Sequence, residues 1–338
     1  MSCYNIGSCW IDLFLIENQR FFIPQWSKLL FTSLLTRNLW WRMGAPSIFT
    51  CWIRIELSVV LFMPLLIHGS FFLKEVVVLK YFIIQSVRGL LILSLLFTGL
   101  SQDLTAITRF RIMLIFILKT GTFPFFQWVV SLGERISWYP LFILLSVQKI
   151  IPLIFISHFC SREIELVALI GWAVLPLLVM STKKIKSLVT VSSIFMFLAI
   201  LCSLCRSVFK WKNLIILYLL ALCPVRVLGD SPLRLKVFTL GSGASSYLAG
   251  WRVVLLSFMG VPPLPGFLVK AELFRILLER RVTMSMVFLS GRMLIVWVYL
   301  NLWFLIITPV HMVWTESLIS ELTIPLTSLI CIRLLLLI

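Results

Sequence analysis

The feature that most constrains this chain is a succession of apolar stretches, each close to 20 residues long, separated by short polar segments. An apolar helix of about 20 residues spans the hydrocarbon core of a bilayer. In lipid, only helices and closed barrels satisfy every backbone group, and these stretches are too long for alternating barrel strands of about ten residues. The sequence therefore predicts an all-α, polytopic membrane helix bundle.

About ten or eleven transmembrane helices are expected. A weak span falls within residues 8–36, where Glu17, Arg20 and Pro24 interrupt the apolar pattern. The clearer spans cover 48–67, 76–99, 107–130, 138–158, 164–181, 187–205, 212–229, 248–270, 283–309 and 320–338.

Composition and charge agree with a membrane protein and argue against a nucleic-acid-binding one. The chain has 338 residues, of which 61% are apolar and only 13% charged, and its mean hydropathy is +1.07. The formal charge of +17 results from 30 Lys and Arg against 13 Asp and Glu residues, and the basic residues are scattered between apolar runs, with no basic stripe or aromatic platform. The segments 182–186 and 206–212 carry three basic residues each, so the positive-inside rule gives no orientation.

No metal or nucleotide motif is present in the sequence. Only Cys202 and Cys205, of eight cysteines, form a C-x-x-C pair, whereas structural zinc needs four ligands. Gly241-Ser242-Gly243 lacks the third glycine and the preceding strand of a dinucleotide site. The histidines lie near the ends of predicted spans, at positions His68, His158 and His311. We expect no metal site.

The first residues match neither a secretory signal nor a transit peptide. A protein this hydrophobic without an import signal is expected to be bacterial or made inside an organelle.

Three lysines and one glutamate lie deep in apolar stretches: Lys119, Lys149, Lys270 and Glu56. A lysine at the centre of a spanning helix costs roughly 2.5–3.5 kcal/mol on insertion scales, so each needs a polar interior path or a partner charge. Glu56 lies in the middle of the span 48–67 and is the natural counter-ion for one of the lysines. The alternative for Glu56 is an ion pair with a purely structural role.

Helix-breaking residues accompany Lys119. Gly121 and Pro124 follow it closely, and they predict that the helix breaks or unwinds there. Broken helices at membrane depth expose carbonyls and helix ends that can coordinate a moving cation. The alternative is that Lys119 reaches the membrane interface and that the residues after it form a re-entrant loop.

The other two lysines have similar surroundings. Lys149 is flanked by apolar residues on both sides, with Pro152 as a second source of helix distortion. Lys270 closes the segment 257–270, in which three prolines and two glycines fall within seven positions, so no straight helix is expected. Removal from water favours the neutral form of a lysine, so near neutral pH such a residue can take up and release a proton.

Four segments, taken in order and spacing, resemble NADH dehydrogenase subunit 2, the smallest antiporter-like membrane subunit of respiratory complex I. The likeness covers about residues 48–275, and a lysine at 270, where the related subunit 4 usually has a glutamate, favours subunit 2. The segments are Trp52 to Glu56; Lys80-Tyr81-Phe82 with Gln85-Ser86; Lys119-x-Gly121-x-x-Pro124-Phe125-x-x-Trp128 followed by Gln148-Lys149-x-x-Pro152; and Gly260-x-Pro262-Pro263-Leu264-x-Gly266-Phe267-x-x-Lys270.

The resemblance implies that Glu56 and Lys119 form a coupling ion pair, that Lys149 is the central relay lysine, and that Lys270 is the lysine of the outlet half-channel. The chain would move protons in the mitochondrial inner membrane as part of NADH:ubiquinone oxidoreductase, coupled electrostatically to quinone reduction elsewhere.

The resemblance also implies an antiporter-like fold and a division of labour. NADH, FMN, iron–sulfur clusters and ubiquinone would be bound by other subunits, and no cofactor by this chain. Its partners would be lipid and other complex I membrane subunits, including neighbouring antiporter-like ones. One membrane domain is expected over 1–338, with a divergent part (1–47), an antiporter-like core (48–275) and C-terminal helices (276–338).

The sequence departs from the family at several positions. Where the family commonly has Ser-Ser-Ile-x-His-x-Gly, this chain has Met196 and Leu198 in place of the histidine and the glycine. Additional cations stand inside spans at Lys80, Arg88, Arg252 and Arg292. Two other functions stay open: a stand-alone cation/proton antiporter, which would typically be longer, and a non-catalytic membrane scaffold, which would need no titratable buried cation.

Overall fold

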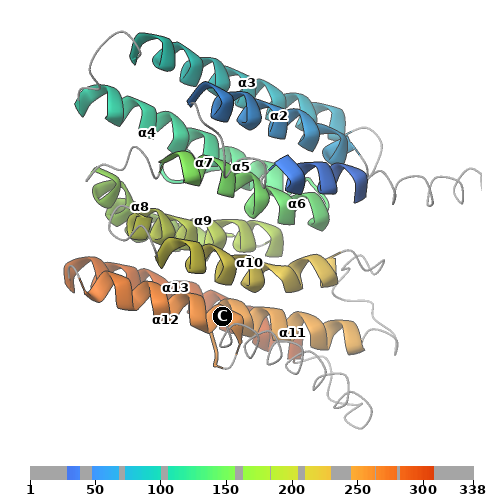
Figure 1. Cartoon of the computed structure of the whole chain (residues 1–338). Coiled ribbons are helices and arrows are strands. Elements are labelled where there is room, and N and C mark those ends of the chain that lie inside the picture. Colours follow the sequence, from blue (N-terminus) through green and yellow to red (C-terminus); the bar gives the residue numbers. More distant parts are fainter. Residues whose placement is uncertain are drawn as a thin grey trace, which may run out of the picture. The chain divides into compact units, whose positions relative to one another are not determined.

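The computed structural model describes most of the chain as α-helix (Figure 1). Contacts group the chain into two compact units, Met1–Leu96 and Phe97–Ile338. Within the described residues every regular element is helical, which confirms the all-α prediction. The described ranges are 29–38, 48–67, 73–99, 106–156, 163–182, 184–204, 210–229, 245–262, 264–279 and 282–307.

The N-terminal unit holds a helical segment over 29–38, then α2 (Ile48–Ile67) and α3 (Leu73–Gly99). The second unit holds ten described helices: α4 (Ala106–Thr120), α5 (Gln127–Gly133), α6 (Trp138–Leu145), α7 (Val147–Ile156), α8 (Glu163–Ser181), α9 (Ile185–Leu204), α10 (Lys210–Gly229), α11 (Ser245–Met259), α12 (Pro265–Leu278) and α13 (Val282–Ile307).

Four helices in the described part of the chain are long and apolar enough to cross a membrane. They contain the segments Val76–Ser94, Ile164–Ser181, Ile185–Leu204 and Val282–Trp303. The chain is therefore a multi-pass membrane protein. The total of ten or eleven helices stays a prediction, because most of the weak span in 8–36 and the whole of 320–338 lie outside the described residues.

Several predicted spans are each divided into two shorter helices. The spans 107–130 and 248–270 break where glycine and proline predicted it, between α4 and α5 and between α11 and α12. The span 138–158 also breaks, but at Ser146 and not at Pro152, which lies inside α7. The sequence predicted distortion at Pro152 and no break at Ser146, and a helix can carry a proline when its neighbours satisfy the freed backbone groups.

Helix α4 ends in a glycine turn directly after Lys119. Gly121 has φ +64°, a conformation that glycine adopts without steric cost. Its amide donates to the carbonyl of Leu118 at 3.3 Å, and the amide of Thr122 donates to that of Ile117 at 3.2 Å. This pair of hydrogen bonds is a Schellman motif, which satisfies the last carbonyls of a helix.

Helix α11 ends in the same way. Gly260 has φ +84°, its amide donates to the carbonyl of Ser257 at 3.1 Å, and the amide of Val261 donates to that of Leu256 at 3.2 Å. The two helix breaks beside Lys119 and Lys270 thus share one local structure, and both depend on a glycine in the left-handed region.

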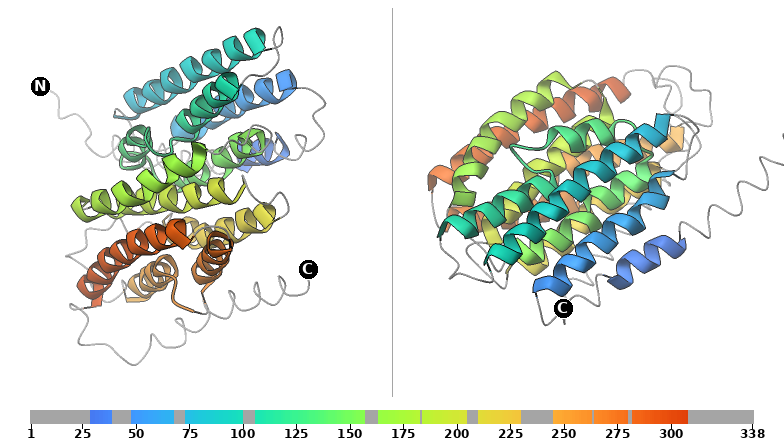
Figure 2. Two further views of the ribbon diagram at one scale, coloured as in Figure 1. Left: turned by 90° about the vertical axis from the view of Figure 1, so that its left-hand side faces the viewer. Right: turned by 90° about the horizontal axis from the view of Figure 1, so that it is seen from above.

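Helix α9 forms the centre of the second unit and is buried from Ser187 to Leu204. It packs against α8 on one side and against α5, α10 and α12 on others. The helices α8, α9 and α10 form one layer and α11, α12 and α13 the next, as Figures 1 and 2 show. Because α9 is covered along its length, its few polar side chains must face the protein interior.

Close approaches between helices depend on glycines. A Cβ atom at Gly171 of α8 would lie 2.7 Å from Cδ1 of Leu198 on α9. The absence of a side chain at Gly171 therefore gives room for Leu198, which stands where the family commonly has glycine. Between α8 and α13, a Cβ atom at Gly291 would lie 2.5 Å from the carbonyl oxygen of Trp172 and 3.1 Å from the ring of Phe195.

Replacement of Gly291 by alanine is expected to destabilise the protein. The added methyl group would meet backbone, which cannot rotate away, and forced overpacking costs about 1–3 kcal/mol. The loss should appear as a lower thermal unfolding temperature of the detergent-solubilised protein. Ser290→Ala, at the exposed neighbouring position of the same helix, is the matched control. An unchanged unfolding temperature for Gly291→Ala would contradict the close α8–α13 packing.

Candidate functional site

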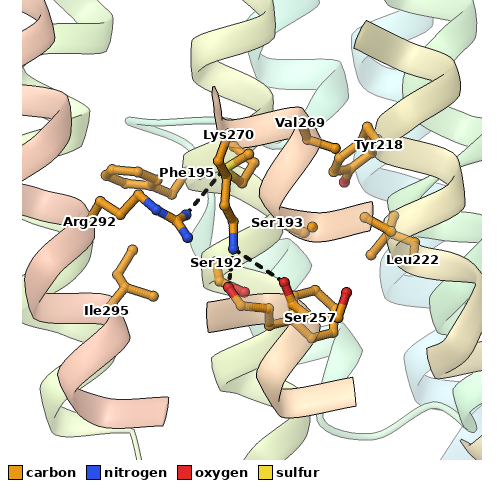
Figure 3. Close-up of a pocket in the computed structure, with 14 residues that line it drawn as sticks. Ser192, Ser193, Phe195, Tyr218, Leu222, Ser257, Val269, Lys270, Arg292 and Ile295 are labelled. Atoms are coloured by element: carbon orange, nitrogen blue, oxygen red, sulfur yellow. Dashed lines mark hydrogen bonds between the residues drawn. The ribbon is translucent and has the colours of Figure 1, made fainter. Parts of the chain in front are cut away.

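Lys270 lies in the second turn of α12, and its side chain reaches back to the C-terminal end of α11 (Figure 3). The residue is 9% exposed. Its ammonium nitrogen donates to the carbonyl of Phe258 and lies 3.4 Å from that of Ser257. Carbonyls at a helix C-terminus carry partial negative charge, so they stabilise a cation that has left bulk water.

The start of α12 is what brings Lys270 to these carbonyls. Pro265 occupies the first turn, where its missing N–H is not needed. Gly266 lies against the backbone of Ser257, and a Cβ atom at Gly266 would be 2.7 Å from the carbonyl carbon of that residue. Only glycine allows this approach, so Gly266 is needed for α12 to begin against the end of α11.

Lys149 lies in the first turn of α7, just after the break at Ser146, and is 2% exposed. Its ammonium nitrogen lies 3.5 Å from the hydroxyl oxygen of Ser193 on α9 and 4.9 Å from the ring centre of Phe197. The hydroxyl supplies a polar partner and the ring face a weak cation–π attraction. The second-unit interior therefore holds Lys149 with neutral groups from α9.

The break at Ser146 is supported by a side chain from α10. The hydroxyl of Tyr218 donates to the carbonyl of Leu145, the last residue of α6, at 3.0 Å. Ser193 lies beside the same tyrosine hydroxyl. Tyr218 thus satisfies a carbonyl that the break releases, and it connects the Lys149 region with α10.

A cavity of about 30 Å³ is bordered by Lys270 itself and by Ser193, the hydroxyl partner of Lys149. This volume admits about two water molecules. The hydroxyl of Ser257 faces it and has no hydrogen-bond partner in the described part of the chain. The full lining is Ser192, Ser193, Phe195, Met196, Tyr218, Ala221, Leu222, Ser257, Phe258, Gly266, Val269, Lys270, Arg292 and Ile295.

Arg292 of α13 is a member of this site that the sequence did not assign. It stood out only as an extra cation inside an apolar run. In the structure its guanidinium donates to the carbonyl of Met259 at 2.5 Å and approaches the sulfur of Met196 at 3.9 Å. On the same helix, the hydroxyl of Tyr299 forms a 2.7 Å hydrogen bond with that of Ser192. No spacing in the sequence marks Tyr218, Tyr299 or Ser257, since each is an isolated hydroxyl in an apolar helix.

Lys119 is buried in the last turn of α4, where the helix C-terminus favours a cation. The hydroxyl of the next residue, Thr120, lies 3.1 Å from the carbonyls of Phe116 and Ile117. Helix α4 packs against α7, so Lys119 and Lys149 stand on neighbouring helices.

Glu56 lies on α2 in the N-terminal unit, half-buried against α3. A Cβ atom at Gly89 would be 2.6 Å from its carboxyl carbon, and the indole of Trp52 donates to the Gly89 carbonyl at 2.9 Å. Tyr81 lies within electrostatic range of both Glu56 and Arg88. Arg88, which is 7% exposed, therefore adds a buried cation to this region that the sequence did not connect with Glu56. The ion pair of Glu56 with Lys119 stays a prediction.

Among the described residues, no group of three or more His, Cys, Asp or Glu side chains could hold a metal ion. Cys202 is buried on α9. Cys205 and the three histidines lie outside the described residues.

Comparison with known proteins places the chain among named relatives. The sequence is 29% identical over 223 residues to NADH-ubiquinone oxidoreductase chain 2 of Artemia franciscana, covering 65% of this chain and 70% of the relative. It is 26% identical over 290 residues to the protein of that name from Rhipicephalus sanguineus, with 83% and 88% covered. The chain is thus similar over most of its length to proteins named NADH-ubiquinone oxidoreductase chain 2. No protein-family model matches the sequence.

Solved structures agree with this family at the level of fold. A chain of respiratory complex I from Thermus thermophilus matches with a TM-score of 0.65 at 17% identity, covering 75% of this chain and 64% of that one. A chain of the Mrp complex from Dietzia gives 0.63 at 15%, with 76% and 56% covered. The membrane-bound sulfane sulfur reductase, an archaeal respiratory membrane complex, gives 0.66 at 13%, with 84% and 68% covered. This chain thus has the fold of chains from three different complexes, and it spans less than two thirds of two of them.

Replacement of Tyr218 by phenylalanine is expected to weaken the junction of α6 and α7. The change removes the donor to the Leu145 carbonyl, and a buried group left without its partner costs about 1–3 kcal/mol. Hydrogen exchange should then become faster at the amides of 146–149. Ser203→Ala is the control, because its buried hydroxyl bonds only within α9, to the carbonyl of Ile200. Unchanged exchange in Tyr218→Phe would show that the tyrosine does not hold the break.

Proposed function

We propose that this chain is a proton-translocating membrane subunit of NADH:ubiquinone oxidoreductase, respiratory complex I, in the mitochondrial inner membrane. The observation that carries the proposal is the cavity of the second unit, which is lined by Lys270 and by Ser193, the hydroxyl partner of Lys149. The named relatives, all chain 2 proteins, support the assignment to this complex. Oxidation of NADH and reduction of ubiquinone, with the flavin and iron–sulfur clusters, belong to other subunits.

In this proposal a proton moves from Lys149 to Lys270 through hydroxyls and water. Ser193, 3.5 Å from the Lys149 nitrogen, can accept a proton on one lone pair and donate its own, as every hydroxyl can. The cavity then needs only one or two waters to reach Lys270. The carbonyls of Ser257 and Phe258 stabilise the proton on Lys270 after it arrives.

Coupling to the redox reaction is proposed to be electrostatic. If Glu56 moves away from Lys119, the charge of that lysine is no longer compensated, and the field at Lys149 on the neighbouring helix changes with it. Work against the membrane potential is about 2.3 kcal/mol per charge for each 100 mV. A single charge displaced by a few ångströms in an apolar interior can supply energy of this size.

Two other functions make different demands on the same residues. A stand-alone cation/proton antiporter would use the lysines without any dependence on NADH. A non-catalytic scaffold would need none of them to change protonation. The proposed function is favoured because the relatives match over most of their own length, up to 88%, and carry the name of a complex I chain.

Replacement of Lys149 by methionine tests the proposal. In inside-out vesicles that carry the assembled complex, we expect NADH-driven proton uptake to fall at least tenfold, since methionine keeps the packing volume but cannot hold a proton. Lys184→Met is the control. Lys184 is exposed, its nitrogen lies 2.6 Å from a carboxylate oxygen of Glu134, and it is not among the residues that line the cavity. Unchanged uptake in Lys149→Met would favour the scaffold. Proton exchange driven by a sodium or potassium gradient without NADH would favour the antiporter.

Replacement of Ser193 by alanine tests the path itself. The hydroxyl is the polar contact of Lys149 on α9, so its loss is expected to slow proton uptake several-fold while the complex stays assembled. Ser203→Ala removes a buried hydroxyl from the same helix, one that makes the same one-turn bond, and should leave uptake unchanged. Equal rates in the two variants would exclude Ser193 from the path.

A further inference from the structure

Arg292 and Lys270 approach the same helix end from two sides. The guanidinium comes from α13 and binds the carbonyl of Met259, while the ammonium comes from α12 and binds that of Phe258 (Figure 3). A Cβ atom built on Gly260 would lie 2.8 Å from Nη2 of Arg292 and 3.1 Å from Nζ of Lys270. The two nitrogens therefore lie within the range of about 6 Å over which like charges strongly oppose each other.

Gly260 makes this arrangement possible. It has a positive φ and no side chain, so both cations fit against the turn that follows α11. The carbonyls of Phe258 and Met259 belong to the same helix end, whose partial charge amounts to about half of one elementary charge. Two full positive charges thus share a negative end that compensates less than one of them.

The other groups around Lys270 do not add negative charge. From α10 the facing titratable group is Tyr218, and from α13 they are Arg292 and Tyr299. The facing residues of α9 are neutral, and α11 contributes backbone carbonyls there, with Arg252 further back along the same helix. No Asp or Glu is among the residues that line the cavity. Glu272, on α12 itself, is outside the lining.

The two cations differ in how readily they lose a proton. A guanidinium in a protein keeps its proton, whereas a lysine ammonium can lose one when its surroundings oppose its charge. Arg292 is also held in place by a second contact, to the sulfur of Met196. Of the two groups, Lys270 is therefore the one whose deprotonation can relieve the repulsion.

We propose that Arg292 is a positioning residue of the proton relay, a fixed positive charge that makes Lys270 release its proton. In this step an N–H bond of the ammonium breaks, the electron pair stays on Nζ, and a water molecule takes the proton. The neutral lysine is then ready to receive the next proton through the cavity. This inference rests on the proposed function, since it concerns the same lysine.

The pH profile of proton translocation by the assembled complex in inside-out vesicles tests this role. Arg292→Gln removes the charge and keeps an amide donor for the Met259 carbonyl. Without the repulsion Lys270 holds its proton more firmly, so the pH at which uptake per NADH falls to half is expected to rise by about one to two units. Arg292→Lys keeps the charge, and its profile should stay where it is. Arg275→Met is the control for loss of a cation, since Arg275 of α12 is exposed and pairs with Glu279.

The outcomes separate the charge from the shape of the side chain. A shifted profile for Arg292→Gln with an unchanged one for Arg292→Lys supports the proposal. Unchanged profiles in both, or the same shift in both, overturn it. Arg292→Met is a second neutral variant, and if neither neutral variant assembles, Arg292 acts in folding and the proposal is overturned. Failure of the proposed function is a separate result, because the Lys149→Met variant, in which Arg292 is intact, would then still take up protons.

Discussion

The structure of the second unit depends on how positive charge is held in an apolar interior. Lys270 is bound by the last carbonyls of α11, and Lys119 stands at the C-terminal end of α4. Both helices end inside a predicted membrane span, and each ends in a glycine turn whose amides donate hydrogen bonds to carbonyls of the last helical turn. In a continuous helix the carbonyls are hydrogen-bonded within the helix and are not available to a lysine. The breaks supply the carbonyls that stabilise a buried cation.

The breaks have a cost in packing that small residues reduce. Gly266 allows α12 to begin against the backbone of α11, and Gly171 and Gly291 allow α8 to approach α9 and α13 closely. Around α9 the remaining space is filled by aromatic rings, with Phe288 packed against Trp172 and Phe195 at centroid distances of 5.3 Å and 5.2 Å. Rigid packing of this kind keeps the hydroxyls of Ser192 and Ser193 facing one small cavity, and a proton path needs such fixed distances.

Much of the architecture could be read from the sequence because its causes are local. Apolar runs of membrane length predicted helices, and Gly121, Pro124 and the cluster 260–266 predicted two of the three breaks. The break at Ser146 was not predicted. Its support, Tyr218, comes from a helix about 70 residues further along the chain, and no local pattern carries that information. The same holds for Arg292, which was visible as an unusual cation but had no assigned neighbour.

Residue type and spacing alone indicated a helical membrane protein with a few lysines beside helix interruptions. These properties follow from residue type and from spacing along one chain, since burial of polar groups in lipid is penalised wherever they occur. The folded structure was needed to show that Lys270 lines a cavity, that Ser193 connects this cavity with Lys149, and that a second cation stands beside Lys270. Those facts depend on contacts between α7, α9, α10, α11, α12 and α13, and contact between distant segments is set by packing of the whole unit.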